Sequence, residues 1–126
     1  MKINIKATGI ELTPAISSYV NKKISSLAKY LGKSADALVA QVEVGKSTKH
    51  HKSGEVFKAE IHLFGVGLDL YAVSEQNDLY AAIDLVKDEI ARNISHLKGK
   101  RETLSRRGAQ AIKNMLKGLN FFRRRK

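Results

Sequence analysis

The sequence contains no cysteine. Disulfide bonds, thiolate zinc sites and thiol nucleophiles are therefore excluded. It also has no apolar run near the roughly 18 residues that a membrane-spanning helix requires. The segment at residues 1–6 alternates between apolar and polar side chains and lacks the apolar stretch of a signal peptide, so we expect a cytoplasmic location and no membrane.

Positive charge is what the sequence has in excess, with a formal net charge of +11 on 126 residues. Residues 99–126 hold ten Lys or Arg and one acid, whereas residues 1–98 hold thirteen Lys or Arg and eleven acids. A polyanionic partner is expected, with most of the long-range attraction coming from the C-terminal end. The rest of the chain must then bind through a local patch.

These charge and hydropathy patterns divide the chain into two parts. The hydrophobic content of 43% is enough to build a core. We expect a folded α+β domain at residues 1–98, followed by a basic and flexible tail at residues 99–126. Within the tail, a short amphipathic helix is marked by Ile112, Met115, Leu116, Leu119 and Phe122. An isolated helix of this length is marginal in water, so we expect a partner to order it.

Two helices are predicted from apolar residues that recur every three or four positions. The first begins at Pro14, with Thr13 as its N-cap, and ends at Gly32. Its buried stripe comprises Ile16, Val20, Ile24, Leu27 and Leu31. The second covers residues 77–98, with Asn77 as its cap, and its stripe comprises Leu79, Ile83, Val86, Ile90, Ile94 and Leu97.

Four strands complete the predicted order β-α-β-β-β-α. The first lies at residues 2–7, and the other three lie between the helices. Their inward positions are Leu38, Ala40, Val42 and Val44, then Phe57, Ala59, Ile61 and Leu63, then Leu68, Leu70 and Ala72. A polar loop, Gly45–Gly54, joins the second strand to the third, and a turn at Phe64–Gly67 precedes the fourth.

The topology follows from these connections. The first helix can act as a crossover that makes the first two strands parallel, and the remaining strands form an antiparallel meander. Because each strand has a single apolar face, we expect a four-stranded mixed sheet with both helices packed on one face. Lys58, Glu60 and His62 should lie on the opposite, solvated face.

No metal site, cofactor or catalytic activity is expected. The neighbouring His50 and His51 lie in a polar loop, and no nearby residues complete a ligand set. Asp84 and Asp88 are four residues apart and could resemble a catalytic carboxylate pair. Solvated helix charges explain them more simply, because no nucleophile motif or phosphate-binding loop accompanies them.

One ridge of the first helix suits nucleic acid. Ser18, Lys22, Ser25 and Lys29 follow 4-3-4 spacing with no acid among them. Hydroxyl and ammonium groups on one ridge can contact phosphates. An ordinary solvated face is the alternative interpretation, and the sequence leaves both open.

Two segments resemble a known family. Asp78–Asp84 reads Asp-Leu-Tyr-Ala-Ala-Ile-Asp, which is similar to the signature of the ribosome hibernation promoting factors. That family includes the ribosome-associated inhibitor A proteins and was once labelled sigma-54 modulation protein. Leu12–Ile16 resembles its entry into the first helix, and the match extends over about residues 1–101. The family fold is akin to double-stranded RNA-binding domains. Since 28 residues follow Lys98, we expect a short-type factor without the C-terminal dimerisation domain.

The resemblance implies a translation inhibitor that binds the small ribosomal subunit and its rRNA near the decoding centre. It would compete with tRNA and mRNA there, stabilise idle ribosomes, and be a monomer off the ribosome. By position, Lys23, Lys29 and Arg92 match basic positions of the family, and Tyr80 matches the signature tyrosine. Glu89 and His96 lie where relatives often carry Lys, which shifts the expected RNA footprint toward the tail.

Two groups of cations are therefore predicted to bind RNA. The candidate contact residues are Lys22, Lys23, Lys29, Lys87, Arg92, Lys98, Lys100 and Arg101. The cations that supply electrostatic attraction from the tail are Arg106, Arg107, Lys113, Lys117, Arg123, Arg124, Arg125 and Lys126. Two alternatives remain: a general structured-RNA-binding or ribosomal protein, and binding of anionic membranes through the amphipathic segment at residues 112–122.

Overall fold

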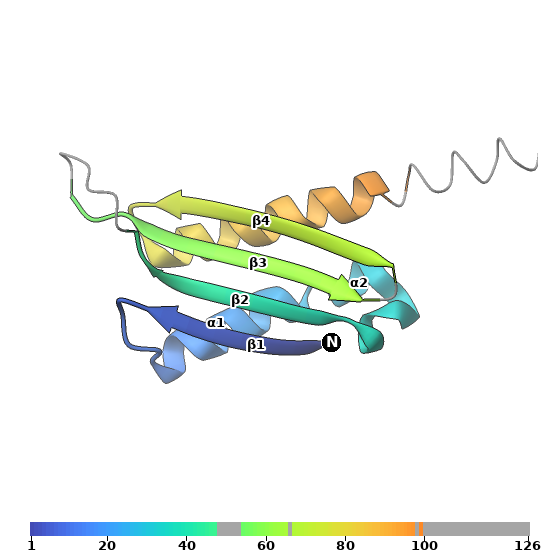
Figure 1. Ribbon diagram of the computed structural model, residues 1–126, viewed down its shortest axis with the longest axis horizontal. Helices are drawn as coiled ribbons and strands as arrows, with labels where there is room; N and C mark the ends of the chain where they lie inside the picture. The colour runs from blue at the N-terminus through green and yellow to red at the C-terminus, as the bar shows by residue number, and fades with distance from the viewer. Residues whose placement is uncertain (48–53, 66, 98, 100–126) are drawn as a thin grey trace, which may run out of the picture. The chain divides into compact units, whose positions relative to one another are not determined.

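A computed structural model describes residues 1–47, 54–65, 67–97 and 99 (Figure 1). The chain divides into a first unit, Met1–Ile94, and a second, Ser95–Lys126, and the fold given below is that of the first. Its elements are β1 (Lys2–Thr8), α1 (Pro14–Ser25), α2 (Ala28–Leu31), the 3-10 helix η1 (Gly32–Ala37), β2 (Val39–Lys46), β3 (Phe57–Gly65), β4 (Leu68–Gln76) and a long helix over residues 79–97. The predicted β-α-β-β-β-α order is confirmed.

The strands form one mixed sheet in the order β1-β2-β3-β4. β1 runs parallel to β2, with Ile5 opposite Val42, and α1, α2 and η1 form the crossover between them. β2, β3 and β4 are antiparallel neighbours, and Val42 lies opposite Ile61. The predicted parallel pairing of the first two strands and the antiparallel meander of the others are therefore confirmed.

The core lies on one face of this sheet, between the strands and the helices. In Figure 1, α1 and the long helix both lie on the far side of the strands. The buried cluster comprises Val20, Ile24, Leu27, Leu38, Ala40, Val42, Val44, Ala59, Ile61, Leu63, Ala72, Leu79, Ala82, Ile83, Val86, Ile90 and Ile94, and the partly buried Ile3, Ile5 and Ala7 of β1 pack against it. Nothing polar is buried in the described part of the chain. The prediction that both helices cover one face is confirmed.

The first predicted helix is interrupted, which the sequence pattern did not indicate. α1 ends at Ser25, and the chain turns before α2 begins at Ala28. Two serine hydroxyls donate back to main-chain carbonyls here, Ser25 to Asn21 and Ser26 to Lys23. Such bonds compete with the regular helical ladder. The backbone tightens at the same place, because Leu27 donates to the carbonyl three residues earlier, that of Ile24, at 3.0 Å.

Two other predicted boundaries are wrong by one or two residues. The long helix is capped by Asp78 and not by Asn77, since the Asp78 carboxylate accepts a hydrogen bond from the Ala81 amide at 3.0 Å. β2 continues through Gly45 and Lys46, which were assigned to the loop. The rest of that loop at residues 48–53, including His50 and His51, lies outside the described residues, as does the predicted tail helix. No helix in the described ranges is long and apolar enough to cross a membrane.

Candidate nucleic-acid interface

Four side chains link α1 to the long helix. The Tyr19 hydroxyl donates to Asp84 Oδ1 at 2.7 Å, and Lys23 Nζ lies 3.5 Å from the same oxygen. The Tyr80 ring meets the Tyr19 ring edge to face, with centroids 4.8 Å apart. Tyr19 and Lys23 are one helical turn apart, as are Tyr80 and Asp84, so each helix contributes one pair. We call Tyr19, Lys23, Tyr80 and Asp84 the interhelical cluster.

The cluster is electrostatically coupled. The hydrogen bond to Asp84, together with partial burial, raises the pKa of the Tyr19 hydroxyl to about 12. Lys23 Nζ also lies 5.4 Å from the centroid of the Tyr19 ring. Asp84 Oδ1 therefore accepts a hydrogen bond from a hydroxyl and forms an ion pair with an ammonium group, which gives this carboxylate a structural role. Asp88 forms a separate ion pair with Lys87 at 2.6 Å.

The predicted RNA contacts separate into two classes. Lys23 and Lys87 are engaged by Asp84 and Asp88, and the Asp88 hydrogen bond raises the pKa of Lys87. Lys22, Lys29 and Arg92 are exposed, and none of the three forms an ion pair with another residue that the structure describes. Lys29 follows the break between α1 and α2, so it does not continue the 4-3-4 ridge of a single helix. It lies 5.1 Å from the centroid of the Tyr30 ring.

The remaining candidates belong to the C-terminal part of the chain. Lys98, Lys100, Arg101 and all the tail cations lie outside the described residues. These residues nevertheless account for most of the net positive charge of the chain. The described residues contain ten Lys or Arg and eleven Asp or Glu, whereas the chain as a whole has a net charge of +11. The entire positive excess therefore belongs to residues 48–53, 98 and 100–126.

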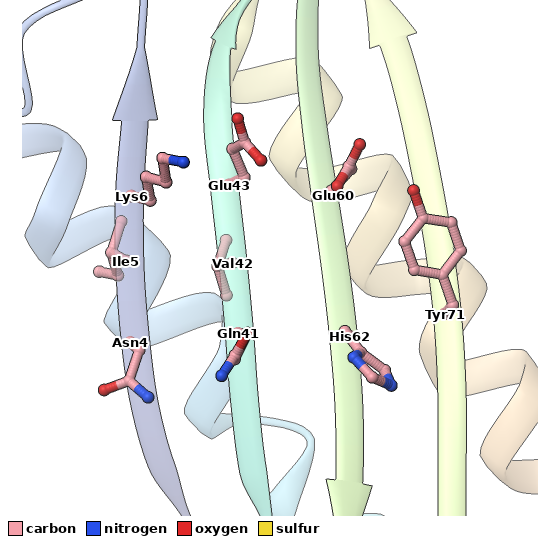
Figure 2. A pocket seen from close by; sticks show the side chains of 9 residues that line it. All are labelled: Asn4, Ile5, Lys6, Gln41, Val42, Glu43, Glu60, His62 and Tyr71. Carbon is pink, nitrogen blue, oxygen red and sulfur yellow. The ribbon is translucent and has the colours of Figure 1, made fainter.

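The open face of the sheet, which the helices do not cover, differs in charge from the helical face. A shallow hollow there is lined by polar side chains from all four strands, as Figure 2 shows: Asn4, Lys6, Gln41, Glu43, Glu60, His62 and Tyr71. Glu43 and Glu60 lie directly opposite each other on β2 and β3. Farther along β3, His62 Nε2 lies 2.6 Å from Asp69 Oδ1.

Two neighbouring carboxylates make this face a poor binding surface for phosphates. Glu43 accepts a hydrogen bond from Thr8 at 2.7 Å, and Glu60 pairs with Lys58 at 3.0 Å. Of the lysines on this face, Lys58 is therefore already engaged by Glu60. The prediction that Lys58, Glu60 and His62 lie away from the helices is confirmed. No group of three metal-ligating side chains occurs among the residues that the structure describes.

The interhelical cluster was missed by sequence reasoning. Asp84 was considered as part of the signature at residues 78–84 and as one member of a carboxylate pair, and Lys23 was considered as an RNA contact. Tyr19 and Asp84 are 65 positions apart, and no local pattern links them. A signal was present, because each helix has a pair of polar or aromatic residues at i and i+4 beside its apolar stripe. Only the packing of the two helices shows that these pairs meet.

Comparison with known proteins agrees with this fold. The family model described as Sigma 54 modulation protein / S30EA ribosomal protein matches residues 3–102. The chain belongs to this family. The resemblance predicted from the signature at residues 78–84 is thereby confirmed.

The relatives of this family member carry informative names. A ribosome hibernation promoting factor from Klebsiella oxytoca is 31% identical over 100 residues, which is 79% of this chain and 96% of that protein. A ribosome hibernation promotion factor from Bacillus subtilis is 33% identical, and the match spans 79% of this chain but only 50% of that protein. The crystal structure of the Thermus thermophilus Protein Y N-terminal domain superposes with a TM-score of 0.63 at 30% identity, covering 77% of this chain and 99% of that domain.

Proposed function

We propose that this protein is a ribosome hibernation factor that binds the rRNA of the small ribosomal subunit through its helical face. In that position it excludes tRNA and mRNA near the decoding centre and holds idle ribosomes in an inactive state. The observation that carries the proposal is family membership over residues 3–102, combined with relatives that are named for ribosome hibernation. Its place of action is then the cytoplasm.

The charges of the two faces support the helical one as the RNA-binding surface. Lys22, Lys29 and Arg92 are exposed cations without an acidic partner in the described ranges, whereas the open sheet face places Glu43 opposite Glu60. Phosphate contacts come chiefly from Lys and Arg. Structured RNA is recognised mainly by its shape and its backbone, so three cations held on packed helices suit it.

The distribution of charge gives the tail a separate role. The described residues have one more acid than base, so they provide no long-range attraction to RNA. The tail at residues 99–126, with ten Lys or Arg against one acid, supplies it. The proposed protein therefore has two parts, a binding domain at residues 1–98 and a basic tail at residues 99–126.

Sedimentation with ribosomal subunits tests the helical face. The triple variant Lys22→Glu, Lys29→Glu and Arg92→Glu should no longer co-sediment with the small subunit in sucrose gradients, and it should no longer reduce tRNA binding. A matched control reverses three lysines of the open face, Lys2, Lys6 and Lys58, with the same change in net charge. Circular dichroism establishes that both variants are folded. If the helical variant binds as the wild type does, or the control variant loses binding equally, the assignment to the helical face is wrong.

Removal of the tail tests its contribution separately. A variant lacking residues 102–126 loses eight Lys or Arg and one acid. The affinity for the small subunit should fall, and the slope of log K against log salt should become flatter, because each phosphate contact adds about 0.9 to that slope on a duplex. Unchanged affinity and slope would show that the tail takes no part in binding. Clear binding of the isolated tail to anionic vesicles and not to ribosomes would favour a membrane role instead.

A further inference from the structure

Lys23 and Lys22 are neighbours on α1 but have different surroundings. Lys23 Nζ lies 3.5 Å from Asp84 Oδ1 and 5.4 Å from the centroid of the Tyr19 ring, and its side chain is 32% exposed. Lys22 is exposed and has no ion pair with any residue in the described ranges. An ammonium group that lies beside a carboxylate and an aromatic ring gains less from a phosphate, since moving to it gives up those contacts, although a partly exposed ion pair contributes only weakly. The two lysines should therefore contribute differently to RNA binding.

Asp84 joins the helices at a single oxygen. Its Oδ1 accepts the hydrogen bond from Tyr19 at 2.7 Å and also faces Lys23, and both partners come from α1. On the long helix, Tyr80 lies one turn before Asp84 and packs against the Tyr19 ring. Ile24 of α1 and Ile83 of the long helix belong to the same buried apolar cluster. A charge-assisted hydrogen bond to a carboxylate adds a preferred distance and direction to this packing.

From this geometry we infer that Tyr19, Lys23 and Asp84 are positioning residues that fix α1 against the long helix, and that Lys23 is not itself a phosphate contact. The spacing between Lys22 of α1 and Arg92 of the long helix depends on that alignment. The inference rests on the proposed function, because it concerns how the helical face is presented to RNA. It replaces the expectation that Lys22 and Lys23 are equivalent contacts.

The salt dependence of small-subunit binding separates a contact from a positioning residue. Lys22→Met should lower the slope of log K against log salt by about 1, as expected for the loss of one phosphate contact. Lys23→Met removes the same charge and keeps a similar apolar stem, yet it should leave the slope unchanged. If Lys23→Met lowers the slope as much as Lys22→Met does, Lys23 contacts phosphate and the inference is overturned.

Tyr19→Phe tests positioning without any change in charge. It removes the hydroxyl that Asp84 binds and retains the ring that packs against Tyr80. The affinity should fall by roughly threefold at every salt concentration, with the slope preserved, so that the line is displaced in parallel. A purely stabilising role would leave the line where it is, because the variant is measured while fully folded. An undisplaced line would therefore overturn the positioning role.

These outcomes are distinct from a failure of the proposed function. If neither Lys22→Met nor the triple reversal of Lys22, Lys29 and Arg92 changes binding, the helical face is not the RNA-binding surface and the proposed function fails there. If Lys22→Met lowers the slope while Lys23→Met does so equally, only the inference fails. Tyr71→Phe, which removes an exposed hydroxyl on the open face, serves as the control for Tyr19→Phe and should change nothing.

Discussion

Replacement of Gly45 by alanine should disrupt the pairing of β1 with β2 near Thr8. Gly45 lies within β2, opposite Thr8 of the parallel strand β1. A Cβ atom at Gly45 would lie 2.0 Å from the Thr8 carbonyl oxygen and 3.0 Å from its carbonyl carbon. Both are backbone atoms, so no side-chain rotation relieves the clash. Glycine in a strand marks such a close approach of two backbones.

The size of the effect follows from this distance. An ordinary contact at Cβ is at least 3.4 Å, so the strands would have to separate by about 1.4 Å near Thr8. That separation breaks the two or three ladder hydrogen bonds around Thr8, each with a net contribution of about 1 kcal/mol. We therefore expect the free energy of unfolding to fall by about 2–3 kcal/mol, a large part of the roughly 5–15 kcal/mol typical of a domain.

Equilibrium unfolding in urea, followed by circular dichroism, measures this loss, and hydrogen exchange locates it. The β1 amides should exchange faster in Gly45→Ala, whereas those of β3 should change only by the global loss of stability. Gly99→Ala is the matched control, because a Cβ at Gly99 meets nothing within 4 Å. That residue is helical, so alanine should be neutral or stabilise by up to about 1 kcal/mol. Equal urea midpoints for Gly45→Ala and the wild type would refute the reasoning.

Three further predictions concern the first unit. Because its pKa is raised to about 12, the Tyr19 hydroxyl contributes its full stabilisation below pH 10 and loses it as the pH rises through about 12. In a pH titration followed by phenolate absorbance, one tyrosine should ionise near pH 12, and Tyr19→Phe should abolish that transition. A titration without it would contradict the hydrogen bond from Tyr19 to Asp84. Asp78→Ala removes an N-cap and should lower the free energy of unfolding in urea by about 1 kcal/mol, whereas Asn77→Ala should lower it by less than about 0.5 kcal/mol. A larger loss for Asn77→Ala than for Asp78→Ala would show that Asn77 is the cap. Ile83→Ala, at a fully buried site, should cost about 2–5 kcal/mol; its control Leu85→Ala, 44% exposed, should cost little, and equal losses would contradict the assigned core.

The parts of the fold that the sequence predicted are those governed by local periodicity. Alternation along β2 and β3 identified the residues that face the core, and one-sided burial then required both helices to cover the same face. A strand can reverse its faces only by slipping one residue, which would expose an entire apolar row. The inward positions of each strand were for that reason predictable, including Val42 and Ile61, whereas no local pattern predicted that these two residues lie opposite each other.

The parts that it did not predict depend on side chains that compete with the backbone or reach another element. Ser26 interrupts the first helix through a hydroxyl whose bond to Lys23 is one of several available to serine. Asp78 and Asn77 are both good caps, and the sequence alone cannot choose between adjacent ones. Likewise, Lys23 reads as an exposed cation until the long helix brings Asp84 beside it. The fold was therefore more predictable than the candidate site.

The two kinds of cation imply two separable steps in binding. Charges are screened beyond about 8–10 Å at physiological salt, so a first unit with balanced charge has little influence on distant RNA. Under the proposed function, a tail with ten cations would carry out the first encounter, whereas Lys22, Lys29 and Arg92 would act only after the helices have approached the RNA surface. Steering charges change the association rate, and contacts within a formed complex change the dissociation rate. Deletion of residues 102–126 should consequently slow association, and the triple helical variant should speed dissociation. A tail deletion that changes only the dissociation rate would show that the tail is bound within the complex and does not steer.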